Sequence, residues 1–369
     1  MKKILQIFDE PIKYGGEESI MSNMLSTLDL KNHYKVDLFT PYYIKNKNLI
    51  NLIENNGGHV FSFDNKNDKN NLNEIKNFLK EKNDYDIYHI NADTIKSIIR
   101  YSSLCKKYNK YAKVIAHTHN IEKKINLWQK FKRIFYKLKL EKNIDCILGD
   151  SKRILEDKFS KNLLKKIYIL DNGVDVERLK YNENIRKEIR EKYNIQNKFL
   201  IGHIGEYTKN KNQKFLIDVF FEVLKMNHNI VLMLIGSGIL KQDIENYAKK
   251  LGIYDNIIFI DESEDVYKYY HAFDIFILPS IYERVGLVGI EAQIAGLPLL
   301  ISKNITKDIY ISNATVYLPL DNKNIWVDLI HKIKSNNNDE YNRKKFVIDY
   351  DKYDKNKTFK IIKDIYDNI

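Results

Sequence analysis

Two glutamates eight residues apart, Glu283 and Glu291, stand in the segment YERVGLVGIEAQIAGLP. The pattern predicts that the strand IFILPS leads through a short loop into a helix that begins near Gly286 and stops at a later glycine and proline. The amides of Gly286, Leu287 and Val288 would then be the unpaired helix-start donors that a phosphate seeks. A carboxylate accepts hydrogen bonds from paired hydroxyls, such as those of ribose and sugar rings. The alternative is that Glu283 complements the helix dipole and Glu291 points to solvent.

Two further segments could contact a phosphate. Lys209 and Lys211 follow the strand-like FLIGHIGE and precede a helical pattern, so a lysine here could meet a diphosphate that the helix start also attracts. Gly15 and Gly16 stand just before the first helical pattern, where their amides could approach a ligand closely. Lysines abound in this chain and glycine pairs are common in turns, so these signals are weaker than the glutamates.

Two histidines, His117 and His119, end the strand-like run KVIAHTHN. Being two residues apart, they lie on one face of the strand. Neither a cysteine nor a carboxylate stands at matching spacing, so we expect no metal site. A hydrogen-bond donor or proton carrier in a cleft is the functional interpretation, and a structural histidine is the alternative for one of the two.

Two series of short apolar runs, separated by helical segments, would position these residues. The first series is KILQIF, YKVDLFT, HVFSF, DIYHI, KVIAHTH, CILGDS and KIYIL, and the second is FLIGHIGE, IVLMLIG, IIFID, IFILPS and LPLLIS. This alternation predicts an α/β fold with two doubly wound, mainly parallel sheets. Ligands of such sheets bind at the carboxyl ends of the strands, which is where the candidate residues lie.

The length of 369 residues allows two domains, each with its own core. A charged, strand-poor stretch between the two series marks the boundary. We expect a Rossmann-like domain over 1–175, a linker over 176–195 and a second Rossmann-like domain over 196–349. The polar helical pattern of residues 350–369 is expected to pack back on the first domain.

Composition narrows the class of protein. The chain is 44% hydrophobic with two cysteines, which indicates a globular protein of a reducing compartment, and we expect it to be cytoplasmic without a signal peptide or membrane span. The net charge is +12, and residues 123–142 have a basic amphipathic pattern. That segment could lie on the anionic inner face of the cell membrane, or be an ordinary helix packed on its own domain. Nucleic-acid binding would rest on charge alone, without a recognition motif.

Glu283 and Glu291 with the intervening RVGLVGI, then EAQIAGLPLLIS, resemble the Glu-x7-Glu signature of retaining family 4 glycosyltransferases, which have the GT-B fold. The resemblance covers nearly the whole chain, because YGGEE, YDIYHINAD, IAHTHN, DNGVD, GHIGEYTKNKN, LIGSG and YYHAFDIFILPS occur in the expected order. The forms IAHTHN and EAQIAGLPLLIS are most similar to bacterial enzymes of capsular polysaccharide and exopolysaccharide synthesis. The resemblance implies two Rossmann-like domains facing across a cleft, the first binding the acceptor and the second the nucleotide-sugar.

The resemblance also implies roles for individual residues of the second domain. Glu291 would bind the ribose hydroxyls of the nucleotide-sugar, and Glu283 would contact the donor sugar near the reacting centre. Lys211 and the amides of residues 286–288 would hold the diphosphate.

In the first domain, His119 best matches the family's histidine beside the donor sugar, with His117 as second choice. Gly15 and Gly16 would form the loop over the phosphate and the acceptor.

One position departs from the family pattern. The family usually has an arginine directly after the glycine of GHIG, and Glu206 stands there instead. Lys209 or Arg284 is expected to supply the missing positive charge. The alternative is a catalytically weak or inactive GT-B protein that acts as a binding partner of another transferase.

The expected function is therefore a retaining, metal-independent transfer of a hexosyl group from a nucleotide-sugar to a saccharide acceptor in cell-surface polysaccharide synthesis. UDP is the expected nucleotide, and no cofactor is expected beyond this co-substrate. A lipid-linked acceptor would suit the basic segment 123–142, and no nucleic-acid partner is expected.

Overall fold

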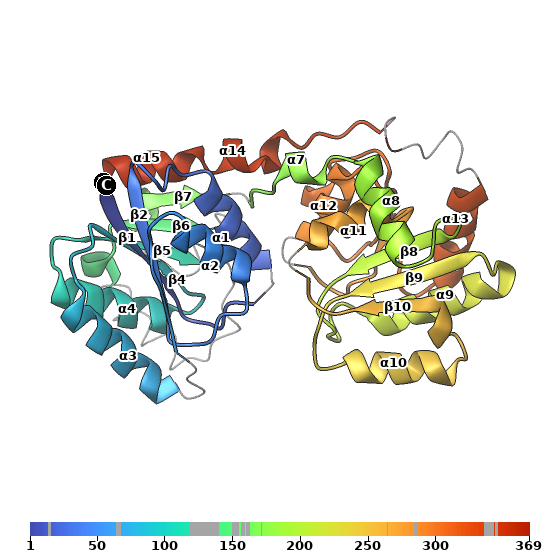
Figure 1. Cartoon of the computed structure of the whole chain (residues 1–369), viewed down its shortest axis with the longest axis horizontal. Helices are drawn as coiled ribbons and strands as arrows, with labels where there is room; N and C mark the ends of the chain where they lie inside the picture. Colours follow the sequence, from blue (N-terminus) through green and yellow to red (C-terminus); the bar gives the residue numbers. More distant parts are fainter. Residues whose placement is uncertain are drawn as a thin grey trace. The chain divides into compact units, whose positions relative to one another are not determined.

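The computed structural model (Figure 1) describes residues 1–13, 16–63, 68–118, 140–149, 155, 159, 163–170, 172–263, 265–283, 286–335, 343 and 346–369. The chain divides into two compact units. Unit 1 comprises Met1–Val174 together with Lys352–Ile369, and unit 2 comprises Asp175–Asp351. Each unit has its own sheet and its own core of buried apolar side chains.

Unit 1 is built on a parallel sheet that has seven strands in the described part of the chain, in the order β3-β2-β1-β4-β5-β6-β7. The interior strand β1 pairs through Ile4 with Val36 of β2 and with Ile87 of β4. Its apolar run is almost fully buried, as expected for a strand covered on both faces. The strands are β1 Lys2–Phe8, β2 Tyr34–Thr40, β3 Val60–Ser62, β4 Ile87–Asn91, β5 Lys113–Thr118, β6 Cys146–Gly149 and β7 Ile167–Ile169.

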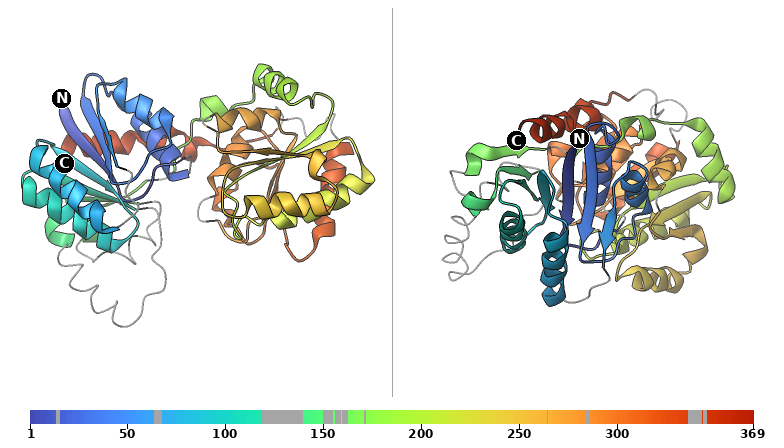
Figure 2. Two further views of the ribbon diagram at one scale, coloured as in Figure 1. Left: turned by 60° about the horizontal axis from the view of Figure 1, so that its bottom comes forward. Right: turned by 60° about the vertical axis from the view of Figure 1, so that its left-hand side comes forward.

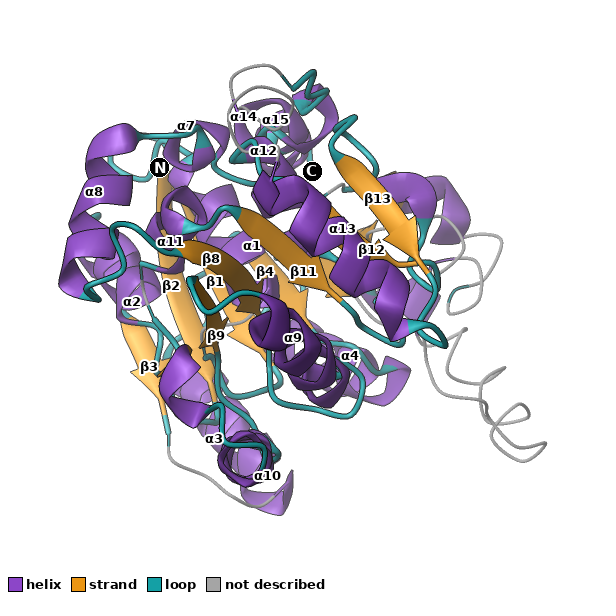
Figure 3. Cartoon of the chain, turned by 90° about the vertical axis from the view of Figure 1, so that its right-hand side faces the viewer, coloured by secondary structure: helices purple, strands orange, loops and turns teal. Residues whose placement is uncertain are grey.

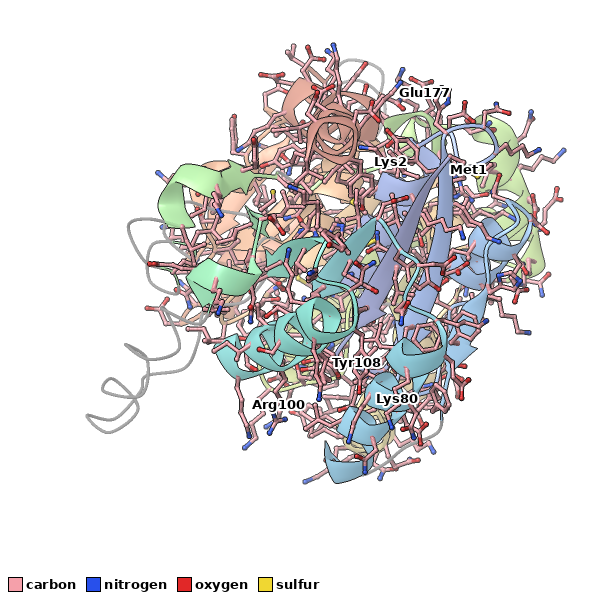
Figure 4. All side chains as sticks on the ribbon, turned by 90° about the vertical axis from the view of Figure 1, so that its left-hand side faces the viewer. Met1, Lys2, Lys80, Arg100, Tyr108 and Glu177 are labelled. Carbon is pink, nitrogen blue, oxygen red and sulfur yellow. The ribbon has the colours of Figure 1, made fainter. Side chains whose placement is uncertain are left out.

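The helices of unit 1 bury apolar faces against this sheet. α3 and α4 contribute to one core with β1, β4 and β5, and Lys80 of α3 and Arg100 of α4 mark these two helices in Figure 4. α4 begins where the side chain of Thr94 accepts the Ser97 amide, a helix-capping bond. The described helices before the crossing into unit 2 are α1 Gly16–Ser26, α2 Lys47–Glu54, α3 Asp68–Glu81 and α4 Ile95–Tyr108.

The last residues of the chain belong to unit 1. α14 (Lys355–Thr358) and α15 (Lys360–Asn368) follow the return from unit 2, and Figure 2 shows the two chain ends near each other. The Lys2 ammonium donates to the carbonyls of Tyr366 and Asp367 at 2.7 and 2.9 Å. These contacts join the first strand to the last helix.

Unit 2 has a second parallel sheet, six-stranded in the described residues, in the order β10-β9-β8-β11-β12-β13 (Figure 3). Its order reverses between β8 and β11, which are neighbours although β9 and β10 separate them in the chain. The strands are β8 Phe199–Ile204, β9 Ile230–Ile235, β10 Ile257–Ile260, β11 Ile275–Leu278, β12 Leu299–Ser302 and β13 Thr315–Leu318.

Helices cover the second sheet. α9 and α13 pack on each other and supply much of the core of unit 2, while α8, α11 and α12 form a separate contacting group that also includes α7. The described helices are α7 Val176–Leu179, α8 Glu183–Lys192, α9 Gln213–Met226, α10 Lys241–Lys250, α11 Val266–Ala272, α12 Leu287–Ile294 and α13 Lys323–Ser335.

Residues 176–195, expected to be a linker, carry α7 and α8 and lie within unit 2. Arg186 and Arg190 of α8 both bond the carboxylate of Asp274, and both donate to carbonyls at the end of α11. Two arginines of this charged stretch therefore hold α8 against α11.

The described residues contain no helix long and apolar enough to cross a membrane. Of the basic amphipathic segment 123–142, residues 123–139 lie outside the described part of the chain.

Candidate active site

The loops that leave β8 and β11 meet at the reversal of the second sheet, where doubly wound sheets bind ligands. The Ile281 amide donates to the carbonyl of Asn210 at 2.8 Å, and the Asn210 side chain donates back to the carbonyl of Tyr282 at 2.5 Å. Asn212 adds a bond to the carbonyl of Pro279 at 3.1 Å. The two loops are therefore fixed to each other before any ligand arrives.

Glu283 and Lys211, 72 positions apart in the chain, form an ion pair across these loops. The Lys211 Nζ lies 2.7 Å from Glu283 Oε1, and the same oxygen accepts the hydroxyl of Ser280 at 2.6 Å. The Glu283 side chain is 8% exposed and that of Lys211 is 20% exposed, so the pair is largely shielded from water. Shielding strengthens the attraction between the two charges.

His203, near the end of β8, interacts electrostatically with both members of this pair. Its Nδ1 donates to the carbonyl of Ile277 at 2.9 Å, and burial lowers its pKa to about 4. The ring is therefore neutral, and its Nε2 is an acceptor that has no hydrogen-bond partner among the described residues. A Cβ on Gly205 would lie 3.4 Å from this nitrogen and 3.3 Å from Cδ of Lys211. His203 and the Lys211 stem thus flank the same glycine.

α12 begins beside Glu283. Gly286 precedes the helix with a φ of 68°, a left-handed conformation that favours glycine, and its carbonyl accepts the Gly289 amide at 2.8 Å. A Cβ on Gly286 would lie 3.7 Å from Cβ of Glu283. Leu287 and Val288 form the first turn, where amides lack partners within the helix. The start of α12 and the Lys211–Glu283 pair therefore adjoin.

Glu291 lies on the next turn of α12 and contacts α11. The hydroxyl of Tyr270 donates to Glu291 Oε2 at 2.6 Å. Burial raises the pKa of this carboxyl to about 7, although the Tyr270 bond lowers it, and burial raises the pKa of the Tyr270 phenol well above its usual value. Near neutral pH, Glu291 thus exists as both carboxyl and carboxylate.

Glu206 and Lys209 are exposed on the loop that follows β8. The Glu206 carbonyl accepts the side-chain amide of Gln213 at 2.9 Å, which ties this loop to the first turn of α9. Arg284 lies outside the described residues. The proposal that Lys209 or Arg284 compensates for Glu206 therefore stays a prediction.

The remaining sequence-predicted residues belong to unit 1. Gly16 is the first residue of α1, while Gly15 and His119 lie outside the described residues. His117, at the end of β5, is buried, and its Nδ1 lies 3.2 Å from Nε2 of His89. His117 is therefore part of a buried polar network.

The glycines of LIGSG face the loop that follows β8 on the side where a side chain would otherwise lie. A Cβ on Gly236 would lie 2.2 Å from the carbonyl oxygen of Gly205, and one on Gly238 would lie 2.6 Å from the Tyr207 nitrogen. The loop after β8 occupies the space instead. These glycines permit two neighbouring exit loops to touch.

Sequence reasoning missed Tyr270, His203 and Ser280. Tyr270 and His203 stand in apolar runs and read as core residues, and Ser280 ends a strand. A signal existed only for His203, a lone ionisable residue directly before the exit loop of a buried strand. Among the described residues, no three His, Cys, Asp or Glu side chains gather in a group able to hold a metal ion.

Comparison with known proteins relates part of the chain to a family. The profile of the family "Glycosyl transferases group 1" matches residues 185–348. EpsF of Bacillus subtilis (strain 168), which is named as a glycosyltransferase, is 24% identical over 320 residues, or 84% of this chain and 81% of its own length. The UDP-Gal:α-D-GlcNAc-diphosphoundecaprenol α-1,3-galactosyltransferase of Escherichia coli is 27% identical over 186 residues, 49% of this chain and 47% of its own.

A solved structure shares the architecture of the entire chain. The crystal structure of Anabaena HepE in complex with UDP and glucose superposes with a TM-score of 0.74 at 14% identity, and the match covers 99% of each chain. At this identity the likeness concerns the fold. The profile match places residues 185–348, most of unit 2, in the family of glycosyl transferases group 1, and the fold of the two units is that of the GT-B glycosyltransferases.

Proposed function

We propose that this chain is a retaining glycosyltransferase that moves a sugar from a UDP-sugar to a lipid-linked saccharide in the synthesis of a bacterial cell-surface polysaccharide. The observation that carries the proposal is the Lys211–Glu283 pair, 2.7 Å apart, beside the start of α12. The Escherichia coli relative, whose name contains UDP-Gal and diphosphoundecaprenol, supports a UDP-linked donor and a lipid-linked acceptor.

The proposed step exchanges one bond for another at C1 of the donor sugar. The bond from C1 to the diphosphate oxygen breaks, and a bond from C1 to an acceptor hydroxyl oxygen forms on the same face. The hydroxyl proton passes to the departing diphosphate. Negative charge grows on the leaving group, and the Lys211 ammonium with the first amides of α12 would stabilise it.

Glu283 has two tasks in this scheme. It holds Lys211 at 2.7 Å before the donor binds, and its second oxygen would accept a hydroxyl of the donor sugar. Glu291 would accept the ribose hydroxyls while Tyr270 holds its other oxygen. Because lysine and helix amides carry the charge in this scheme, we expect transfer to continue in the presence of EDTA.

The test is transfer itself. Purified chain is screened against UDP-sugars by thermal shift, since a ligand of the folded state raises the melting temperature. Each binding donor is then offered with undecaprenyl-diphosphate saccharides, and the anomeric configuration of the product is read by NMR. Lys211→Ala should abolish transfer, while Lys214→Ala, which removes an exposed lysine of α9, should not.

The outcomes separate the alternatives. Transfer with inversion would contradict retention. Donor binding without transfer to any acceptor would instead favour the inactive binding partner, and the Glu206→Arg variant would show whether Glu206 is the cause. Equal activity of Lys211→Ala and the intact chain would exclude this cluster as the donor site.

Peripheral membrane contact through residues 123–142 is a separate part of the proposal. Replacing the lysines of this segment with glutamine should release the chain from vesicles that contain anionic lipid. Unchanged binding to the vesicles would contradict it.

A further inference from the structure

His203 is a buried histidine of which one ring nitrogen is bonded and the other is not. The residue is 1% exposed, and its Nδ1 donates to the carbonyl of Ile277 at 2.9 Å. Burial lowers the pKa of the ring to about 4, so the ring is neutral at pH 7 and its Nε2 is an acceptor. Among the described residues Nε2 has no hydrogen-bond partner. Because a buried acceptor without a partner is costly, a donor that reaches Nε2 is favoured.

The stem of Lys211 runs beside this nitrogen. A Cβ on Gly205 would lie 3.4 Å from Nε2 of His203, and 3.3 and 3.5 Å from Cδ and Cε of Lys211. The ring and the stem therefore border the same narrow space. Rotation about the last bonds of the stem moves the ammonium while Cδ stays where it is. The unbonded acceptor thus borders a side chain that ends in hydrogen-bond donors.

The Lys211 ammonium has hydrogens to spare. It carries three of them, and one goes to Oε1 of Glu283 at 2.7 Å. No second acceptor of this ammonium lies among the residues that the structure describes. The charges of Lys211 and Glu283 both act on the pKa of His203, in opposite directions, so the ring, the ammonium and the carboxylate form one cluster.

A neutral acceptor has a different effect on Lys211 from a carboxylate. Glu283 binds the ammonium and also cancels its charge, which weakens the attraction of the pair for a diphosphate. An imidazole binds the ammonium without cancelling the charge. Once a sugar hydroxyl shares the carboxylate of Glu283, as the proposed reaction requires, the hold of Glu283 on Lys211 weakens and His203 can accept one of the hydrogens.

We infer that His203 is a positioning residue for Lys211, whose ammonium donates to Nε2 of His203 when the UDP-sugar is bound and so stays both fixed and positively charged beside the diphosphate. In this arrangement His203 touches neither the donor nor the acceptor and acts through Lys211. The inference rests on the proposed function, because it assigns a partner to the lysine of that reaction.

The first test needs no substrate. Nitrogen-15 NMR of labelled histidines reports on Nε2 directly, because accepting a hydrogen bond shifts the signal of an unprotonated ring nitrogen, and the signal of His203 is identified by its loss in His203→Asn. In Glu283→Ala the competing carboxylate is gone, so Lys211 should turn to His203 and shift this signal. The shift should be absent from the double variant Glu283→Ala with Lys211→Met. Glu222→Ala, which breaks an exposed ion pair, is the matched control and should not move the signal.

The second test adds a donor. Of UDP-glucose, UDP-galactose and UDP-N-acetylglucosamine, the one that raises the melting temperature most is added to the intact chain at pH 7. The Nε2 signal of His203 should shift in the same direction as in Glu283→Ala. His271 is also buried in unit 2, but both of its ring nitrogens are bonded, to the Asn182 amide at 3.3 Å and to the Arg178 carbonyl at 3.2 Å, so its signals should stay in place.

Two replacements of His203 separate positioning from structure. His203→Asn keeps an amide that can donate to the carbonyl of Ile277 but has no acceptor at the place of Nε2, whereas His203→Gln puts a carboxamide oxygen near that place and gives up the bond to Ile277. In the transfer assay, kcat should fall about tenfold in His203→Asn and about threefold or less in His203→Gln, with little change in KM. Stability against urea should fall more in His203→Gln. His228→Asn, which replaces an exposed histidine of unit 2, should alter neither kcat nor stability.

Activity that follows stability, with the glutamine variant worse in both, would show a merely structural histidine and overturn the inference. So would an unmoved Nε2 signal in Glu283→Ala, or a shift that survives in the double variant. Failure of the proposed function looks different: the intact chain transfers from no UDP-sugar although the signal of Glu283→Ala moves, and the inference then falls with the function. A chain that transfers the sugar while Nε2 of His203 stays unbonded in the bound state keeps the function and loses this assignment.

Discussion

At the scale of single residues, the candidate active site keeps a positive and a negative group in contact. Glu283 fixes the ammonium of Lys211 at 2.7 Å, and Ser280 holds the same carboxylate oxygen at 2.6 Å. A lysine so fixed loses little rotamer freedom when a diphosphate arrives. In the proposed reaction, the pair would therefore hold Lys211 ready to bind the diphosphate.

Replacing Glu283 with glutamine tests whether the proposed reaction depends on this ion pair. Glu283→Gln should lower kcat about 100-fold, because the amide holds Lys211 without charge assistance and cannot accept a sugar hydroxyl with equal strength. Donor affinity should change less than kcat, which steady-state kinetics with the UDP-sugar would measure. Glu222→Gln is the matched control, since Glu222 pairs with Lys225 and Lys323 on an open surface, and kcat should not change. An unchanged kcat in Glu283→Gln would remove Glu283 from the reaction.

The carboxyl of Glu291 should give donor binding a pH dependence. Its pKa of about 7 in the ligand-free protein, raised by burial, means that half is protonated at that pH. In the proposed donor site the ribose hydroxyls would bind the carboxylate, so lowering the pH below 7 places a proton where the ligand must bind. We expect the UDP-sugar to bind about tenfold more weakly at pH 6 than at pH 8, because the carboxylate fraction falls by that factor.

Titration calorimetry between pH 6 and pH 8 measures the affinity for the UDP-sugar. It should also detect the proton that Glu291 releases on binding. A UDP-sugar is the suitable ligand because its esterified diphosphate keeps its charge over these pH values. His203, with a pKa lowered to about 4, does not change charge there either. The Glu291→Gln variant should bind the UDP-sugar weakly at both pH values, and its affinity should not change with pH. A pH dependence that persists in this variant would come from another titrating group.

At the scale of elements, the exit loops of the second sheet touch each other through glycines. The Gly236 backbone has a φ of 145°, and a Cβ there would lie 2.2 Å from the carbonyl oxygen of Gly205. Both the conformation and the contact exclude larger residues. This contact orients the loop that carries Lys211.

The variants Gly236→Ala and Gly252→Ala separate the effect of backbone strain from the effect of a steric collision. Gly252 has a φ of 71° but open space around a Cβ, so alanine should cost about 1 kcal/mol of unfolding free energy from backbone strain alone. Gly236→Ala should cost about 3 kcal/mol or more, because strain and collision add. Urea unfolding followed by Trp326 fluorescence, in a Trp128→Phe background, reports on unit 2. An equal loss of unfolding free energy in the two variants would show that the two exit loops can move apart at no energetic cost.

The elements were largely predictable from local pattern. All twelve expected strand segments are strands, because buried parallel strands need continuous apolar runs that stand out in a charged sequence. β13 was missed, since Thr315–Leu318 is short, half-buried at its centre and apolar only in part. The bounds of α12 followed from the glycine that precedes the helix and from the glycine that ends it.

The site was predictable only as far as topology goes. The rule that ligands bind at strand ends brought Lys211 and the start of α12 to one edge, and the pair with Glu283 agrees with it. The bond from Tyr270 to Glu291 depends on how α11 packs on α12, which no periodicity specifies. The acceptor Nε2 of His203 depends on a bond to a backbone carbonyl of β11, from which β9 and β10 separate it in sequence. The roles of these side chains in catalysis stay predictions.

At the scale of the whole molecule, the chain leaves unit 1 after Val174 and returns to it at Lys352. Unit 1 is thus built from two separate stretches, while unit 2 is continuous. Ile362 and Tyr366 of α15 are fully buried, and the Tyr366 hydroxyl lies 2.9 Å from Nε2 of Gln6 and 2.6 Å from Nδ1 of His89. The last helix therefore packs on strands from the first part of the chain and completes the core of unit 1.

Removal of residues 352–369 should consequently lower the stability of unit 1 and leave that of unit 2 unchanged. The truncated chain loses apolar contacts and leaves Gln6 and His89 without their common buried partner, so β1 and β4 should lose protection in hydrogen exchange. β8 and β11 should keep theirs. Tyr366→Phe in the full chain is the milder variant, because it removes only the hydroxyl, and it should lower the unfolding free energy of unit 1 by about 1–3 kcal/mol. Protection of β1 and β4 that survives truncation would show that unit 1 is complete without its last helix.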